Sequence, residues 1–142
     1  METLVELEKY FEDECYSFAE LTIGKHHASE GLVIERQNNQ FLFAYSERGH
    51  LTVVKSFLTE KELVDYAFQE VSNDKWNRGH LVAWTWNEES ILEAEKELNR
   101  LNISFERNDI SNYSVEKHAY RIFVFGRDVL LLTDFRRTYY KA

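Results

Sequence analysis

Three apolar segments separated by two short polar turns constrain the fold of this chain more than any other feature. They span residues 32–36, 41–45 and 51–57, and each has the length and the β-branched or aromatic side chains typical of a strand. The first turn carries two asparagines and the second a glycine, which are residues that tolerate a positive φ. Both alternating faces of the middle segment are apolar, so it is predicted to lie inside a sheet. The pattern therefore predicts a three-stranded meander.

Apolar side chains that recur every three to four residues predict helices elsewhere in the chain. These predicted helices span about residues 2–20, 60–73 and 88–101. Gly24 is the expected stop after the first helix. Thr59 and Glu62 have the spacing of a capping box at the start of the second, and Asn87 is the expected N-cap of the third. The third helix is predicted to turn Ile91, Ala94, Leu98 and Leu101 inward.

The C-terminal half is predicted to add further strands to the sheet. These strands span residues 81–86, 103–108, 119–125 and 129–135, and a polar loop at residues 109–116 is the segment predicted to be most mobile. The last two strands are expected to form a hairpin around Gly126, and the unbroken apolar run that begins at Val129 predicts a strand buried on both faces. The element order is then α-βββ-α-β-α-βββ. It predicts an α+β fold with a mostly antiparallel mixed sheet and a single globular domain over residues 1–142.

Charge and cysteine content limit the classes of partner and the compartment. The chain has 25 acidic against 17 basic residues, for a net charge of -8, which disfavours direct binding of nucleic acid because phosphate contacts need clustered Lys and Arg. The single cysteine, Cys15, cannot form a disulfide within the chain. The acidic N-terminus does not resemble a signal peptide, and no apolar run has the length of a membrane helix. We therefore expect a cytoplasmic protein with no membrane association.

The residues that usually do chemistry form no recognisable motif. His26 and His27 are adjacent in a predicted connection, where side chains of neighbouring residues point apart, so a shared metal ion is not expected. Cys15 falls on the apolar face of the first predicted helix, where a buried thiol is inert. His50 and His80 each stand beside an arginine at the start of a strand. If the two strand starts were neighbours, these side chains would converge as in the active site of a metal-independent ribonuclease. Such a small enzyme stays open as an alternative. No catalytic, cofactor or metal residue is predicted.

Carboxylates on the third predicted helix point instead to a binding surface. Glu89, Glu93 and Glu97 occupy positions i, i+4 and i+8, and Glu88 precedes them in the first turn. Such a stripe is either an ordinary solvated face or an anionic patch that steers a basic protein toward it. Trp76 stands in a polar stretch where a core residue is not expected, and tryptophan is a common anchor of interfaces.

The chain as a whole, from METLVELEKYFEDECYSF to TDFRRTYYKA, resembles immunity proteins of bacterial polymorphic-toxin systems. It is similar in particular to the immunity partners of the Bacillus wall-associated contact-dependent toxin. The resemblance implies a non-catalytic inhibitor that binds the C-terminal nuclease domain of a cognate toxin, a transfer-RNA-cleaving enzyme. Glu88, Glu89, Glu93, Glu97 and Trp76 are then the expected toxin-binding residues. A structural or adaptor domain remains the alternative without such a partner.

Overall fold

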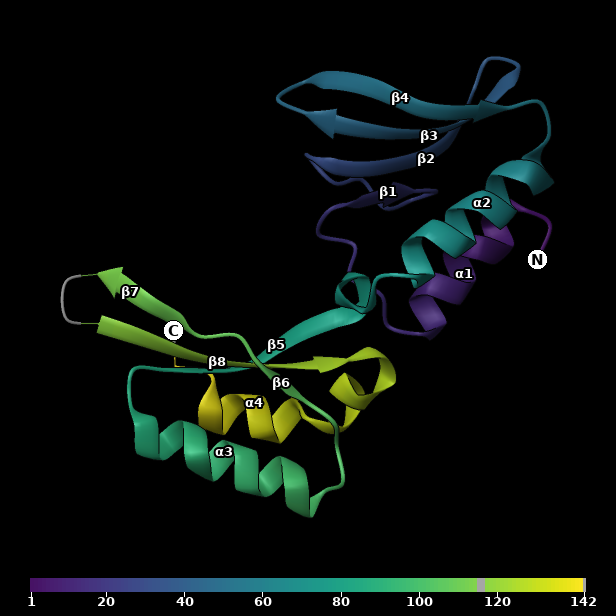
Figure 1. The fold of residues 1–142 in the computed structure, drawn as a ribbon. Helices are drawn as coiled ribbons and strands as arrows, with labels where there is room; N and C mark the ends of the chain where they lie inside the picture. The colour runs from purple at the N-terminus through teal and green to yellow at the C-terminus, as the bar shows by residue number, and fades with distance from the viewer. Residues whose placement is uncertain (115–116, 142) are drawn as a thin grey trace. The chain divides into compact units, whose positions relative to one another are not determined.

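The structure is a computed structural model that describes residues 1–114 and 117–141. Its elements, in chain order, are α1 (Leu4–Asp13), β1 (Leu21–Ile23), β2 (Gly31–Gln37), β3 (Gln40–Glu47), β4 (His50–Phe57), α2 (Glu60–Ser72), the 3₁₀ helix η1 (Lys75–Arg78), β5 (Gly79–Thr85), α3 (Glu88–Arg100), β6 (Glu106–Arg107), β7 (Ile110–Ser114), β8 (Lys117–Phe125), the 3₁₀ helix η2 (Gly126–Leu131) and α4 (Thr133–Tyr139) (Figure 1). A mixed sheet followed by an antiparallel sheet confirms the predicted α+β fold class.

The chain divides into two compact units, Met1–Asn77 and Arg78–Ala142. Each unit has a sheet and a hydrophobic cluster of its own, built from side chains that lie within that unit. The single domain predicted over the whole chain stays a prediction. None of the helices in the described residues is long and apolar enough to cross a membrane.

The sheet of the first unit has the strand order β1-β2-β3-β4. The short strand β1, which was not predicted, runs parallel to β2, and the other two pairs are antiparallel. β3 lies inside the sheet as predicted. Asn38 in the first turn has a φ of 56°, and Arg48 and Gly49 in the second have φ values of 51° and 80°, which confirms the predicted turns. Figure 1 shows α1 and α2 together on one side of this sheet, where their apolar faces form the core with it.

β4 forms one edge of this sheet, and its residues are exposed from His50 to Ser56. Leu51, Val53 and Val54 expose 42%, 49% and 55% of their surface, and exposed apolar side chains on an edge strand favour pairing with another chain. A register irregularity interrupts the β3–β4 ladder between Phe43 and Ala44. A bulge of this kind twists an edge strand and makes it a poorer template for another chain.

α1 ends at Asp13, seven residues before the predicted end, because the chain turns left-handed at Cys15. Cys15 has a φ of 55°, its N–H donates to Glu12, and the N–H of Tyr16 donates to Phe11. These are the two hydrogen bonds of a Schellman motif, and the Tyr16 ring packs 4.8 Å from the Phe11 ring. The prediction that Cys15 is a buried residue of this helix was therefore wrong, and so was the prediction that Gly24 ends the helix.

Replacing Cys15 by glycine is expected to raise the free energy of unfolding by about 0.5–1 kcal/mol, because glycine adopts a positive φ without the clash of a Cβ atom. Cys15→Ala is the matched control, since it removes the thiol but keeps Cβ. Urea denaturation of the three proteins measures the difference. A glycine variant no more stable than the alanine variant would show that this turn is not strained.

The second unit contains β5, β8 and β6 in that order, with β7 also paired to β8, and all these pairs are antiparallel. α3 and α4 share the second hydrophobic cluster with β5 and β8. Ile91, Ala94 and Leu98 of α3 are buried as predicted, whereas Leu101 is 39% exposed. Leu101 lies at the helix end, just before Asn102 turns left-handed with a φ of 57°, which explains why it leaves the buried face.

The largest error of the sequence interpretation concerns the C-terminus. Residues 129–135 do not form a strand, because η2 and α4 occupy this stretch. Leu132 and Phe135 are buried, while Leu130 and Leu131 expose 59% and 71% of their surface. Val129, Leu132 and Phe135 thus face the core at intervals of three residues, which is a helical period. The predicted polar loop at 109–116 was also wrong where it is described, since β7 covers Ile110–Ser114; residues 115 and 116 lie outside the described residues.

Candidate functional site

The N-terminal turn of α3 carries two of the predicted toxin-binding glutamates, Glu88 and Glu89, and both are exposed. Asn87 caps the helix by accepting a hydrogen bond of 3.1 Å from the N–H of Ser90. The helix dipole favours carboxylates in this first turn. Glu88 Oε2 also lies 3.5 Å from the hydroxyl of Tyr120, and partial burial together with this carboxylate raises the pKa of Tyr120. Glu89 makes no ion pair among the described residues.

The remaining two glutamates of the predicted stripe lie in different surroundings. Glu93 is exposed, whereas Glu97 is half-buried and accepts a hydrogen bond of 3.0 Å from Arg100 Nε. The hydrogen bond from Arg100 lowers the pKa of Glu97. Burial raises the pKa of Tyr139 on α4, and the negative charges of Glu93 and Glu97 add to this effect. The stripe is therefore uneven: Glu93 makes no ion pair among the described residues, whereas Glu97 is paired with Arg100.

Trp76 belongs to η1 of the first unit, whereas the four glutamates belong to α3 of the second. Its backbone N–H donates to Asp74 Oδ1 at 3.0 Å, and the Lys75 ammonium lies 6.0 Å from the centre of its ring. The side chain is 38% exposed. Neither unit by itself brings Trp76 and the glutamates into one surface.

A cluster of aromatic rings lies beside the start of α3 in the second unit. Trp84 contacts Trp86, Tyr113 and Tyr140, with ring centres 6.1, 5.7 and 6.3 Å away, and Trp86 also contacts Tyr113 at 5.2 Å. Trp86 is 41% exposed and Tyr113 is 50% exposed. The ammonium of Lys117 lies 5.0 Å from the Trp86 ring centre, within the range of a cation–π contact.

Only part of this aromatic cluster was visible in the sequence. The alternation of a strand places Trp84 and Trp86 on one face, but Tyr113 fell in a segment interpreted as a loop. Tyr140 comes to Trp84 because the C-terminal residues run parallel to β5 there. Trp86 is separated from Glu88 by the cap residue Asn87 alone, so an exposed aromatic ring and an exposed carboxylate are close neighbours in the chain here.

Asp109 is the centre of a charged network on the sheet of the second unit. Arg107 donates to both of its carboxylate oxygens, at 3.0 and 2.7 Å, and also to Glu95 at 3.0 Å. The N–H of Arg121 donates to Asp109 Oδ1 at 3.1 Å, and His118 Nε2 lies 3.4 Å from Oδ2. Partial burial tends to raise the pKa of Asp109, but the hydrogen bonds outweigh it and the pKa is lowered. The network joins β6, β8 and α3.

His50 and His80, the residues of the alternative ribonuclease-like enzyme, lie in different units. His50 is exposed at the start of β4, opposite Glu47 of β3. His80 is half-buried in β5, opposite Val124 of β8. Neither unit by itself assembles the convergent pair that such an enzyme needs.

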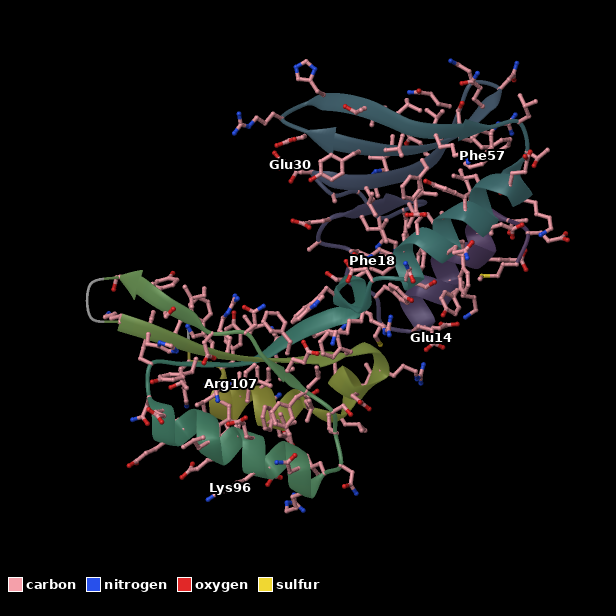
Figure 2. The ribbon with its side chains drawn as sticks, in the orientation of Figure 1. Glu14, Phe18, Glu30, Phe57, Lys96 and Arg107 are labelled. Carbon is pink, nitrogen blue, oxygen red and sulfur yellow. The ribbon has the colours of Figure 1, made fainter. Side chains whose placement is uncertain are left out.

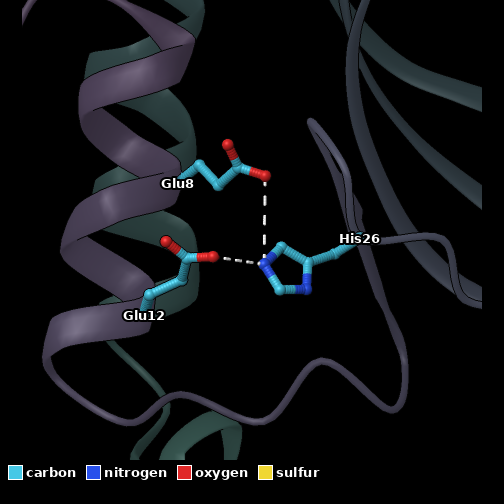
Figure 3. A group of neighbouring side chains, drawn as sticks. All are labelled: Glu8, Glu12 and His26. Atoms are coloured by element: carbon cyan, nitrogen blue, oxygen red, sulfur yellow. Dashed lines mark hydrogen bonds and ion pairs between the residues drawn. The ribbon is translucent and has the colours of Figure 1, made fainter.

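His26 meets two carboxylates of α1, which the sequence interpretation did not anticipate (Figure 3). Its Nε2 atom lies 2.7 Å from Glu12 Oε2 and 3.9 Å from Glu8 Oε2. The hydrogen bond from His26 is the largest cause of the lowered pKa of Glu12. Glu8 and Glu12 are one helical turn apart, which is visible in the sequence. Their approach to His26 depends on the turn after α1, and this turn was not predicted because the helix was expected to continue to about residue 20.

No protein-family model matches this sequence, and no curated protein or solved structure matches it at the level of significance required.

Changing Asp109 to asparagine is expected to make unfolding less dependent on acid pH. Because the folded-state pKa of Asp109 is lowered, its charged interactions stabilise the protein above the ordinary Asp pKa of about 3.9, and this contribution is lost as the pH falls through the folded-state value. Urea denaturation at several pH values between about 3 and 6 should therefore show a difference between wild type and Asp109→Asn that shrinks toward acid. A difference that is constant across this range would contradict the assignment.

Proposed function

We propose that this protein is a non-catalytic immunity protein that binds the C-terminal nuclease domain of a cognate contact-dependent toxin and neutralises it in the cytoplasm. The resemblance of the sequence supports the partner, a basic nuclease that cleaves transfer RNA. The observation that supports the surface is that exposed Trp86, which contacts exposed Tyr113, lies directly before the exposed Glu88 and Glu89 at the start of α3.

The physical basis is complementarity to a surface that binds RNA. A nuclease must present Lys and Arg side chains where RNA phosphates lie. Glu88, Glu89 and Glu93 oppose those cations, which raises the association rate and covers the substrate site without chemistry. Trp86 and Tyr113 offer rigid rings of the kind that supply most of the binding energy in interfaces.

The predicted residues are expected to contribute unequally to binding, because their environments differ. Glu89 and Glu93 are expected to contribute most to steering, because both are exposed. Glu97 is expected to contribute less, since binding a partner would first have to break its hydrogen bonds to Arg100. Trp76, in the first unit, would act as an anchor only for a partner that contacts both units.

A charge-reversed Glu89→Lys/Glu93→Lys protein is expected to bind a cognate toxin nuclease domain with an association rate at least about 10-fold lower at low salt. The expected cause is loss of steering, so the difference should shrink as salt is added. Stopped-flow or surface-plasmon measurements at two salt concentrations give the rates.

Glu47→Lys/Glu70→Lys is the matched control, because it changes the net charge equally at two exposed glutamates of the first unit. It is expected to bind at nearly the rate of wild type. Equal slowing in both variants would mean that net charge and not this surface matters. Failure of the wild-type chain to rescue growth and to form a complex with the nuclease would rule out the immunity function itself.

A further inference from the structure

The cluster of Glu8, Glu12 and His26 combines three side chains that are common ligands of transition metals. The two carboxylates project from one face of α1, and the imidazole comes from the connection that follows β1 (Figure 3). One ligand atom from each residue lies within 4.8 Å of the others. The three side chains are 15%, 32% and 23% exposed, so the cluster is sheltered but open to solvent on one side.

The backbone around His26 holds the imidazole in place before any ligand arrives. Ile23 and His26 exchange backbone hydrogen bonds of 3.0 and 2.9 Å across a two-residue turn. Gly24 begins this turn with a φ of 57°, and a Cβ atom there would lie 2.3 Å from Glu8 Oε2. Glycine therefore allows Glu8 to reach the turn, where its carboxylate accepts a hydrogen bond of 2.8 Å from the N–H of Lys25.

The ring of His26 is also fixed in orientation. The Phe18 ring stacks on it with centres 3.7 Å apart and planes inclined by 13°. Because an ionised carboxylate only accepts hydrogen bonds, Nε2 donates to Glu12 and faces both carboxylates. A restrained imidazole whose nitrogen points between two carboxylates is the arrangement that a metal ion needs, since ligands held in place lose little entropy on binding.

We propose that Glu8, Glu12 and His26 form a binding site for a divalent transition-metal cation of the Zn²⁺ type. His26 Nε2 and one oxygen from each carboxylate supply three ligands, and water completes a four-coordinate shell. Ligand atoms around tetrahedral zinc are about 3.3 Å apart. The present separations of 2.7 and 3.9 Å from Nε2 bracket this value, so side-chain shifts below about 1 Å complete the geometry. The cation takes the place of the proton that Nε2 now shares with Glu12.

The ammonium of Lys25 competes with the metal ion for the carboxylate of Glu12. Its ammonium lies 3.3 Å from Glu12 Oε2, and its side chain is 73% exposed. An exposed lysine of this kind contributes little to stability and can swing into solvent. A bound cation then ties α1 to the connection between β1 and β2. Because it binds the folded state, it also raises the melting temperature.

The purified full chain is titrated with ZnCl₂ in a buffer that does not chelate zinc. Calorimetry measures the affinity and the number of zinc ions bound, and thermal melting with and without zinc measures the change in melting temperature. Wild type is expected to bind one zinc ion and to melt at a higher temperature with zinc. His26→Gln and Glu12→Gln should bind at least about 10-fold more weakly. Lys25→Gln should bind more tightly than wild type, because it removes the competing cation and keeps the backbone N–H that holds Glu8.

His27→Gln is the matched control, since His27 is the adjacent residue, is exposed and is not part of the cluster. It should bind zinc as wild type does. Circular dichroism without metal checks that each variant is folded, and Glu8→Gln replaces any variant that is not. No zinc binding by wild type, equal binding by His26→Gln, or an equal loss in His27→Gln would each overturn the site. None of these outcomes depends on the proposed immunity function.

Discussion

The reversal of the chain immediately after α1 is the constraint on which the arrangement of the first unit depends. Cys15 adopts a left-handed conformation, and two backbone hydrogen bonds close the helix there. Tyr16 then packs on Phe11, so the chain is directed back along α1. β1 follows and pairs with β2, and the turn after β1 brings His26 to Glu12. A longer α1 would move this turn along the chain and so change which side chains meet.

The second unit uses the same kind of turn for a different result. Asn102 is left-handed, Ile103 donates its N–H to Leu98, and Ile103 is buried beneath the end of α3. The chain then runs back into β6, which places Arg107 beside Glu95. In both units a local backbone conformation after a helix determines which charged side chains meet.

The ion pairs formed within each unit determine which carboxylates have a compensating charge nearby. Several carboxylates lie close to a lysine or arginine of their own unit, as Glu12, Glu95, Glu97 and Asp109 do. Their charges are therefore partly cancelled, although the chain as a whole is strongly acidic. Glu89 and Glu93 make no ion pair among the described residues. Among the described residues, exposed carboxylates without an ion pair occur in both units, as Glu47 and Glu89 do, so a net charge of -8 does not by itself say where a cationic partner binds.

Elements whose signals are local could be predicted from the order of residues. The meander of β2, β3 and β4, the caps at Thr59 and Asn87, and the buried face of α3 follow from alternation, turn residues and helical spacing, all of which act over a few residues. The order of residues did not reveal that the run from Val129 continues as a helix, because a short apolar run fits either a strand or a helix until its partners are known. The contact of Tyr113 with Trp86 and the approach of His26 to Glu8 and Glu12 became visible in the folded chain alone. Those contacts join residues that lie far apart in the chain, so no short pattern of residues contains them.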